Sequence, residues 1–222
     1  GDNNTFVGYT AGDATTTAES NVAIGKGSLS TNILGSKSVA IGAEALATQN
    51  PATAVDMYNV AVGHDAGYAI TTGIQNTFIG GQAGDANTTA NNNTGVGKSS
   101  LSATTTGGEN TAVGTNALKV NTTASNNTAV GTNALTANTT GAQNTAVGTS
   151  AGAAITTAVN TVVMGYQAGD AITTGNNNVA IGTTALSANT TGASNTALGH
   201  ATLLANTTAA DNTAVGFSAL GA

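Results

Sequence analysis

Apolar and polar positions follow one another along the chain with a period of 17 residues. The period is marked by a glycine that follows an aliphatic residue, with a single interval of 21 residues between the third and fourth of these glycines: Gly8, Gly25, Gly42, Gly63, Gly80, Gly97, Gly114, Gly131, Gly148, Gly165, Gly182, Gly199 and Gly216. The residue three before this glycine is Thr or Val throughout, and the residue four before it is Asn in eleven of the thirteen repeats. Such a fixed period is typical of architectures in which each repeat stacks on its neighbours.

The residues before each repeat glycine predict a short β-strand. β-Branched side chains alternate there with period two, as at Thr145 and Val147, and the flanking Asn and Gly favour turns because both tolerate positive φ. Gly, Asn and Thr are poor helix formers. We therefore predict an all-β fold, a parallel β-solenoid of the left-handed β-roll type. It would have thirteen coils of 17 residues, each with two short strands and two turns, and one four-residue insertion within 50–57, where the coils should stay in register.

Charged residues are confined to a few positions of the repeat. Of the sixteen Asp, Glu, Lys and His residues, fifteen lie one, two, five, eleven or twelve residues after the repeat glycine, and Asp56 lies in the insertion. Charges avoid burial. We therefore expect the aliphatic residue and the Thr or Val that precede the glycine to point inward. The residue two before the glycine would then point outward.

Stacked coils place identical residues above one another, and we call each such set a column. Asn columns can form hydrogen-bonded ladders along the stack. The predicted ladder residues in three successive coils are Asn110, Asn127 and Asn144, Val113, Val130 and Val147, and Gly114, Gly131 and Gly148.

The column two before the glycine is small and apolar, and a continuous apolar stripe on an outer face marks a contact surface. The residues predicted to pack between chains are Phe6, Phe78, Ala112, Ala129, Ala146 and Val163. A narrow coil buries little apolar area by itself, so we expect side-by-side association into a homotrimer. End-to-end association into a filament is a second expectation, because the end coils expose open sheet edges.

The composition excludes several classes of protein. The chain of 222 residues is 40% hydrophobic but only 6% charged and 3% aromatic, with 30 Gly, which favours a thin regular fold over a thick core. A net charge of −6 without any Arg argues against a nucleic-acid partner. No apolar run approaches the ~18 residues of a membrane span, and the absence of Cys excludes disulfides and thiolate metal sites. We treat 1–222 as one repetitive domain, expected to be a fragment of a longer fibre.

One stretch is reminiscent of a phosphate-binding loop. Gly97, Lys98 and Ser99 end a G-x-x-x-x-G-K-[ST] pattern, but Asn92 stands where its first glycine should be. Gly97 is also explained as a repeat glycine. We predict no nucleotide site here.

Other candidate groups are dispersed. His64 and His200 lie eight coils apart, about 40 Å by the strand spacing, and the side chains of His64 and Asp65 should diverge on extended backbone. The carboxylates five after the glycine are not in consecutive coils and lack the glycine-rich calcium repeat: Asp13, Asp85 and Asp170. We predict no catalytic residue, no metal site and no cofactor, and therefore no enzyme.

Threonine supplies two further candidates. The sequence Asn-Thr-Thr is formally a glycosylation acceptor, although a turn with a Thr ladder is the favoured interpretation, at Asn87, Asn121, Asn138, Asn189 and Asn206. Thr-Thr pairs lie eight and nine residues after most repeat glycines. They resemble the Thr ranks of ice-binding solenoids, although those ranks use alternate rather than adjacent positions.

Two sequence blocks resemble known repeats. "SNVAIGKGSLS" at 20–30 and "KSVAIGAEALA" at 37–47 resemble the head repeat of trimeric autotransporter adhesins, the YadA-like β-roll, and "NTAVGTNALTANTTGAQ" at 127–143 looks like repeats of phage tail fibres and bacterial surface proteins. The resemblance implies an extracellular, homotrimeric stalk or head that attaches to a receptor. We therefore expect a structural or adhesive fibre segment, with an ice-binding solenoid as the alternative.

Overall fold

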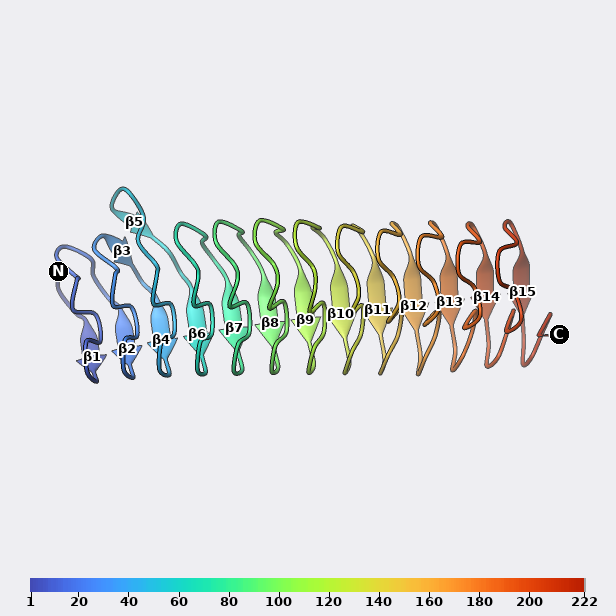
Figure 1. The fold of residues 1–222 in the computed structure, drawn as a ribbon, viewed down its shortest axis with the longest axis horizontal. Coiled ribbons are helices and arrows are strands. Elements are labelled where there is room, and N and C mark those ends of the chain that lie inside the picture. The colour runs from blue at the N-terminus through green and yellow to red at the C-terminus, as the bar shows by residue number, and fades with distance from the viewer. Residues whose placement is uncertain (222) are drawn as a thin grey trace. The chain divides into compact units, whose positions relative to one another are not determined.

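The computed structural model describes residues 1–221 and contains two compact units, Gly1–Asn110 and Thr111–Ala222. Each unit is a stack of short parallel strands, one in each coil (Figure 1). In the first unit the order of pairing follows β1 (Thr5–Val7), β2 (Val22–Ile24), β4 (Val39–Ile41), β6 (Val60–Val62), β7 (Thr77–Ile79) and β8 (Thr94–Val96). In the second unit it follows β9 (Thr111–Val113), β10 (Thr128–Val130), β11 (Thr145–Val147), β12 (Val162–Met164), β13 (Val179–Ile181), β14 (Thr196–Leu198) and β15 (Thr213–Val215).

Strand register repeats the sequence period without slips in each unit. β10 and β11 pair Thr128 with Thr145, Ala129 with Ala146 and Val130 with Val147. No helix occurs in residues 1–221. The prediction of an all-β parallel solenoid is confirmed.

Each coil has one recurring strand rather than the two that we predicted. The remainder of the coil is a series of turns, because residues two and four after the repeat glycine adopt left-handed backbone, as Asn133 (φ 57°) and Leu135 (φ 49°) do. These turns still bond between coils. The amide of Asn133 donates to the carbonyl of Thr115 at 3.0 Å, and that of Leu135 donates to Ala151 at 3.1 Å.

The repeat glycine is required at its position for two reasons. Gly148 has φ of 134°, which L-residues rarely adopt, and a Cβ at this position would lie 2.5 Å from the carbonyl oxygen of Gly165 in the next coil. A side chain here would therefore separate the coils.

The predicted orientation of the strands is wrong: inside and outside are exchanged. The residue two before the glycine points inward, and the side chains of Phe78, Ala112, Ala129, Ala146 and Val163 have no exposed surface, whereas Phe6 in the first coil is 36% exposed. The aliphatic residues Val113, Val130 and Val147 lie partly exposed on the outer side. The inward residue is small in most coils because a large side chain from the opposite turn already fills the core beside it, as the fully buried Leu135 does beside Ala129.

Buried asparagines line the interior beside this column. The backbone amide of Asn144 donates to Oδ1 of Asn127 at 2.9 Å, and Nδ2 of Asn144 donates to the carbonyl of Ala158 at 2.7 Å. In the first unit the amide of Asn110 donates to Oδ1 of Asn93 at 3.0 Å. The Asn column thus forms a ladder in which side-chain oxygens accept from the backbone of the next coil, so the buried amides of this column are bonded.

The insertion is ordered and leaves the repeat strands in register. Val39 pairs with Val60 and Ile41 with Val62 across it. The insertion contributes β5 (Val55–Asp56), which pairs with β3 (Gly35–Ser36) on a loop that projects beyond the neighbouring coils (Figure 1). Met57 turns back into the core, where it is fully buried.

Candidate functional site

The outer face of the strands is a regular surface that recurs in both units. It consists of the residues three and one before the repeat glycine, and we call it the outer strand face. The residues one before the glycine form its aliphatic rank. The most exposed members of this rank are Val7, Ile24, Ile41, Ile79, Val113, Met164, Leu198 and Val215. The adjacent rank is Thr or Val, and in the second unit it is Thr111, Thr128, Thr145, Val162, Val179, Thr196 and Thr213.

The geometry of the outer strand face suits contact with another flat surface. Residues two apart on a strand point the same way, and neighbouring strands lie about 4.8 Å apart. None of the sixteen Asp, Glu, Lys and His residues lies on it. The face therefore presents regular rows of methyl groups and Thr hydroxyls without charge.

The two members of each Thr pair in the inner coils have different environments. The first is partly buried and bonds to the next coil, as when Oγ1 of Thr139 donates to the carbonyl of Thr156 at 3.1 Å and Oγ1 of Thr156 donates to Thr173 at 3.2 Å. The second, such as Thr140 or Thr157, is exposed. Only one Thr of each inner pair is thus available at the surface, whereas both are exposed in Thr16–Thr17 and Thr207–Thr208.

The Asn-Thr-Thr asparagines lie inside the fold. The side chains of Asn87, Asn121, Asn138 and Asn189 have no exposed surface, and Asn206 is partly buried. Nδ2 of Asn138, for example, donates to the carbonyl of Gly141 at 2.9 Å. A transferase could not reach the four buried amides in the folded chain.

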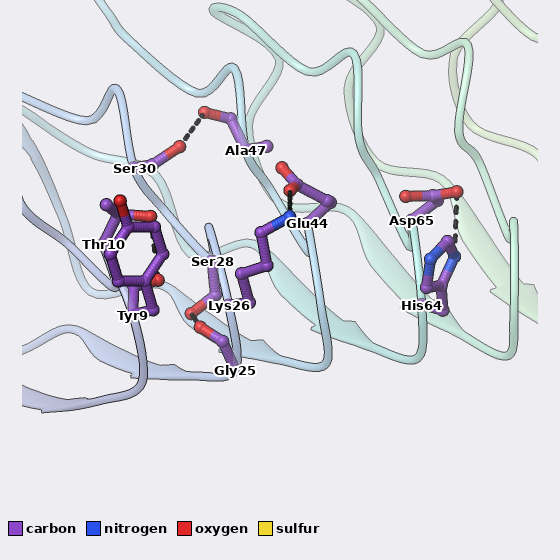
Figure 2. Close-up of polar contacts among 10 residues, drawn as sticks. All are labelled: Tyr9, Thr10, Gly25, Lys26, Ser28, Ser30, Glu44, Ala47, His64 and Asp65. Atoms are coloured by element: carbon purple, nitrogen blue, oxygen red, sulfur yellow. Dashed lines mark hydrogen bonds and ion pairs between the residues drawn. The ribbon is translucent and has the colours of Figure 1, made fainter.

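An acidic hollow lies on the first unit, outside the outer strand face. It has a volume of about 380 Å³ and is lined by Glu44, Asp65, Tyr68 and Asp85. Two of its carboxylates have a basic side chain as partner (Figure 2): Nζ of Lys26 is 3.9 Å from Oε1 of Glu44, and Nδ1 of His64 is 2.9 Å from Oδ2 of Asp65.

The contact between His64 and Asp65 corrects a prediction. We expected their side chains to diverge on extended backbone. Asp65 instead has φ of 57°, and this left-handed turn brings the two neighbouring side chains to the same side.

Asp85 is a partly buried carboxylate of this hollow. Burial raises its pKa above the ordinary range, and the nearby negative charge of Asp65 raises it further. Its Oδ1 is buried without a hydrogen-bond partner. Within residues 1–221 no three His, Cys, Asp or Glu side chains are grouped as metal ligands.

The remaining predicted residues are separate from one another. His200 stacks on Phe217 of the next coil with ring centroids 5.1 Å apart, and Lys98 and Asp13 are exposed. Burial raises the pKa of Asp170 as it does that of Asp85. Among the described residues there is no helix long and apolar enough to cross a membrane.

Sequence reasoning missed the outer strand face because it assigned these residues to the core. The signal that could have identified the inner side is an exchange of side-chain size. Wherever the inner strand residue is Phe, the residue four after the glycine is Gly, as for Phe6 with Gly12 and Phe78 with Gly84.

Comparison of the chain with protein-family models, with curated proteins and with solved structures gives no match.

Proposed function

We propose that this chain is a structural or adhesive segment of an extracellular fibre, without enzymatic activity, in which copies of the chain associate through the outer strand face. The observation that carries the proposal is the aliphatic rank, which is repeated on the outside of every strand in both units. The resemblance of the repeats to those of trimeric adhesin heads and phage tail fibres supports the same function and an extracellular location.

Three copies related by a closed rotation are the proposed assembly. A rotation presents the same face of each chain to a common axis, so that one sequence covers all of its own exposed aliphatic rows. Removal of apolar surface from water contributes roughly 25 cal/mol per Å². Because the contribution adds over many coils, a weak contact per coil gives a stable assembly and a stiff segment.

The test introduces charge on the outer strand face. The double variant Val130→Asp/Val147→Asp should have the mass of a single chain by light scattering, while the wild type has three times that mass, because a buried unpaired carboxylate opposes association. The matched control is Thr132→Asp/Thr149→Asp, at exposed positions one after the glycine in the same two coils, and it should keep the wild-type mass. A wild-type protein with the mass of one chain at millimolar concentration would refute the assembly.

Ice binding is the second candidate, and one observation favours it. Thr128 and Val130, like Thr145 and Val147, occupy alternate positions of adjacent paired strands and so share the outer face. Ordered rows of methyl and hydroxyl groups are what an ice-binding surface would require. The two functions compete for one face: a monomer with thermal hysteresis at micromolar concentration supports ice binding, and a trimer without it supports the fibre.

A further inference from the structure

The insertion builds the one part of the first unit that departs from the repeat. Its strand β5 pairs with β3, and the amide of Met57 donates to the carbonyl of Ser36 at 2.9 Å. The fully buried Met57 side chain anchors one end of the loop, and Pro51 at the other end is also buried. The projecting residues between these anchors are held against the preceding coil.

A polar cluster fixes the outer side of this loop. Nζ of Lys37 donates to Oδ2 of Asp56 at 2.6 Å and to the hydroxyl of Tyr58 at 3.2 Å, and that hydroxyl donates to Asp56 at 3.3 Å. The ammonium also lies 5.3 Å from the centre of the Tyr58 ring. The charge of Asp56 is thereby compensated, and its carboxylate is held in one direction.

An open hollow of about 570 Å³ lies between the loop and the coils before it. Its lining combines hydroxyls, carboxylates and small apolar groups: Thr17, Glu19, Ser36, Ala54, Val55 and Asp56. The volume falls within the range of small-molecule sites, about 300–1,000 Å³.

The polar groups of the hollow are positioned to exchange hydrogen bonds with a ligand. Oγ of Ser36 accepts from the amide of Glu19 at 3.0 Å, which leaves its own hydrogen free to donate. Glu19 forms no salt bridge with any cationic group of residues 1–221. Its carboxylate can therefore accept from a ligand, and such charge-assisted bonds are the stronger ones.

We propose that this hollow binds a neutral saccharide unit, with Glu19 and Asp56 accepting hydrogen bonds from sugar hydroxyls and Val55 contacting the apolar ring face. The two carboxylates disfavour an anion. Lys37 already compensates Asp56, so Glu19 alone could attract a cation, and a simple cation would leave the hydroxyl groups and Val55 of the lining without a contact. An apolar ligand would leave the carboxylates and hydroxyls without partners.

This inference rests on the proposed adhesive function and assigns its receptor contact to the insertion rather than to the repeated faces. The two proposals can fail separately. The hollow lies within one chain, so saccharide binding should persist in the single-chain variant Val130→Asp/Val147→Asp.

The experiment is saturation-transfer NMR on the full chain with six probes: the methyl glycosides of glucose, mannose, galactose and N-acetylglucosamine, ethylammonium, and acetate. We expect at least one glycoside to bind and its Kd to rise at least tenfold in Glu19→Gln, since a hydrogen bond to a charged group is worth about 1.5–3 kcal/mol. The matched control is Glu109→Gln, which removes an exposed carboxylate outside the hollow, and it should leave the Kd unchanged.

Three results would overturn the proposal. The first is the absence of binding by all four glycosides, and the second is a Kd that is the same in Glu19→Gln as in the wild type. The third is tighter binding of ethylammonium or acetate than of every glycoside. A folded wild-type chain is sufficient to obtain the first and third results, so they do not depend on the stability of a variant.

Discussion

The ring of Phe78 occupies the space that a side chain at residue 84 would fill, and Gly84 is the residue found there. In most other coils the arrangement is the reverse, with a small inner strand residue and a large residue four after the glycine, as with Ala129 and Leu135, both fully buried. In these coils one large apolar side chain, from either position, fills the core; where both positions are small, as at Ala146 and Gly152, the buried Ile155 fills it instead. Because core packing is dense, the position of that side chain can change only if its partner changes too.

The first prediction exchanges the two arrangements. Phe78→Ala should destabilise the fold by about 3–5 kcal/mol, as removal of a buried ring does, and Gly84→Leu should destabilise it by overpacking, at about 1–3 kcal/mol or more. The double variant should recover most of both losses, because it recreates the pairing of Ala129 with Leu135. The midpoint of urea unfolding measures this.

The opposite exchange, Ala129→Phe/Leu135→Gly, is the matched control and should also be tolerated better than either single change. Losses that simply add in both pairs would contradict the reciprocal packing.

The second prediction concerns the Asn ladder. Asn144→Ala removes the acceptor for the amide of Thr161 and the donor to Ala158, at 3.0 and 2.7 Å. Both partners are buried, so we expect a loss of about 2–4 kcal/mol in the free energy of unfolding.

The substitution Asn144→Thr is the conservative comparison. Thr161 occupies the same column and retains weaker bonds, with Oγ1 donating to Val159 at 3.3 Å. Denaturation should therefore show a smaller loss for Thr than for Ala. Equal losses in the two variants would contradict this account, because they would mean that the hydrogen bonds of the Asn144 side chain do not contribute to the free energy of unfolding.

The third prediction separates steric overlap from backbone strain at the repeat glycine. Gly148→Ala combines a φ of 134° with a Cβ only 2.5 Å from Gly165, whereas Gly216→Ala has a similar φ of 122° and no atom within 4 Å of the added Cβ. Both variants should unfold at lower urea concentration than the wild type, and Gly148→Ala should lose at least about 2 kcal/mol more. A larger loss at Gly216 would contradict the requirement for close coil contact.

The fourth prediction is a pH dependence at Asp85. Its pKa is raised in the folded state, so the folded chain binds this proton more readily than the unfolded chain, and stability falls as the carboxyl ionises. Asp85→Asn should therefore melt at a higher temperature than the wild type at pH 7. The gain in the free energy of unfolding should be no more than about 1 kcal/mol, because the group is partly solvated.

The difference should vanish near about pH 3, where the wild-type carboxyl is protonated in both states. Asp13→Asn, at an exposed position of the same column, is the control. A wild type that is more stable than Asp85→Asn at pH 7 would show that ionised Asp85 is stabilising.

The period of the chain determined the fold class, but it did not determine which side of the strand is buried. The inner and the outer face of a three-residue strand such as Thr145–Val147 are both free of charge, so the segregation of charges could not distinguish them. A shift of one residue exchanges the two faces. The pairing of Phe78 with Gly84 contains the missing information, because a side chain that requires a compensating Gly must be packed inside. The contact of His64 with Asp65 was missed because nothing in those two residues indicates left-handed backbone.

The claim that the outer strand face is buried between copies is tested most directly by cross-linking single cysteines. The chain contains no Cys, so each of the variants Val147→Cys, Ala146→Cys and Thr149→Cys carries one thiol, treated with a short bis-maleimide. We predict covalent dimers of Val147→Cys alone: Ala146 is buried within its own chain, and Thr149 is exposed away from the outer strand face. Cross-linking of Ala146→Cys, or a Val147→Cys that reacts freely but never joins two chains, would contradict the account.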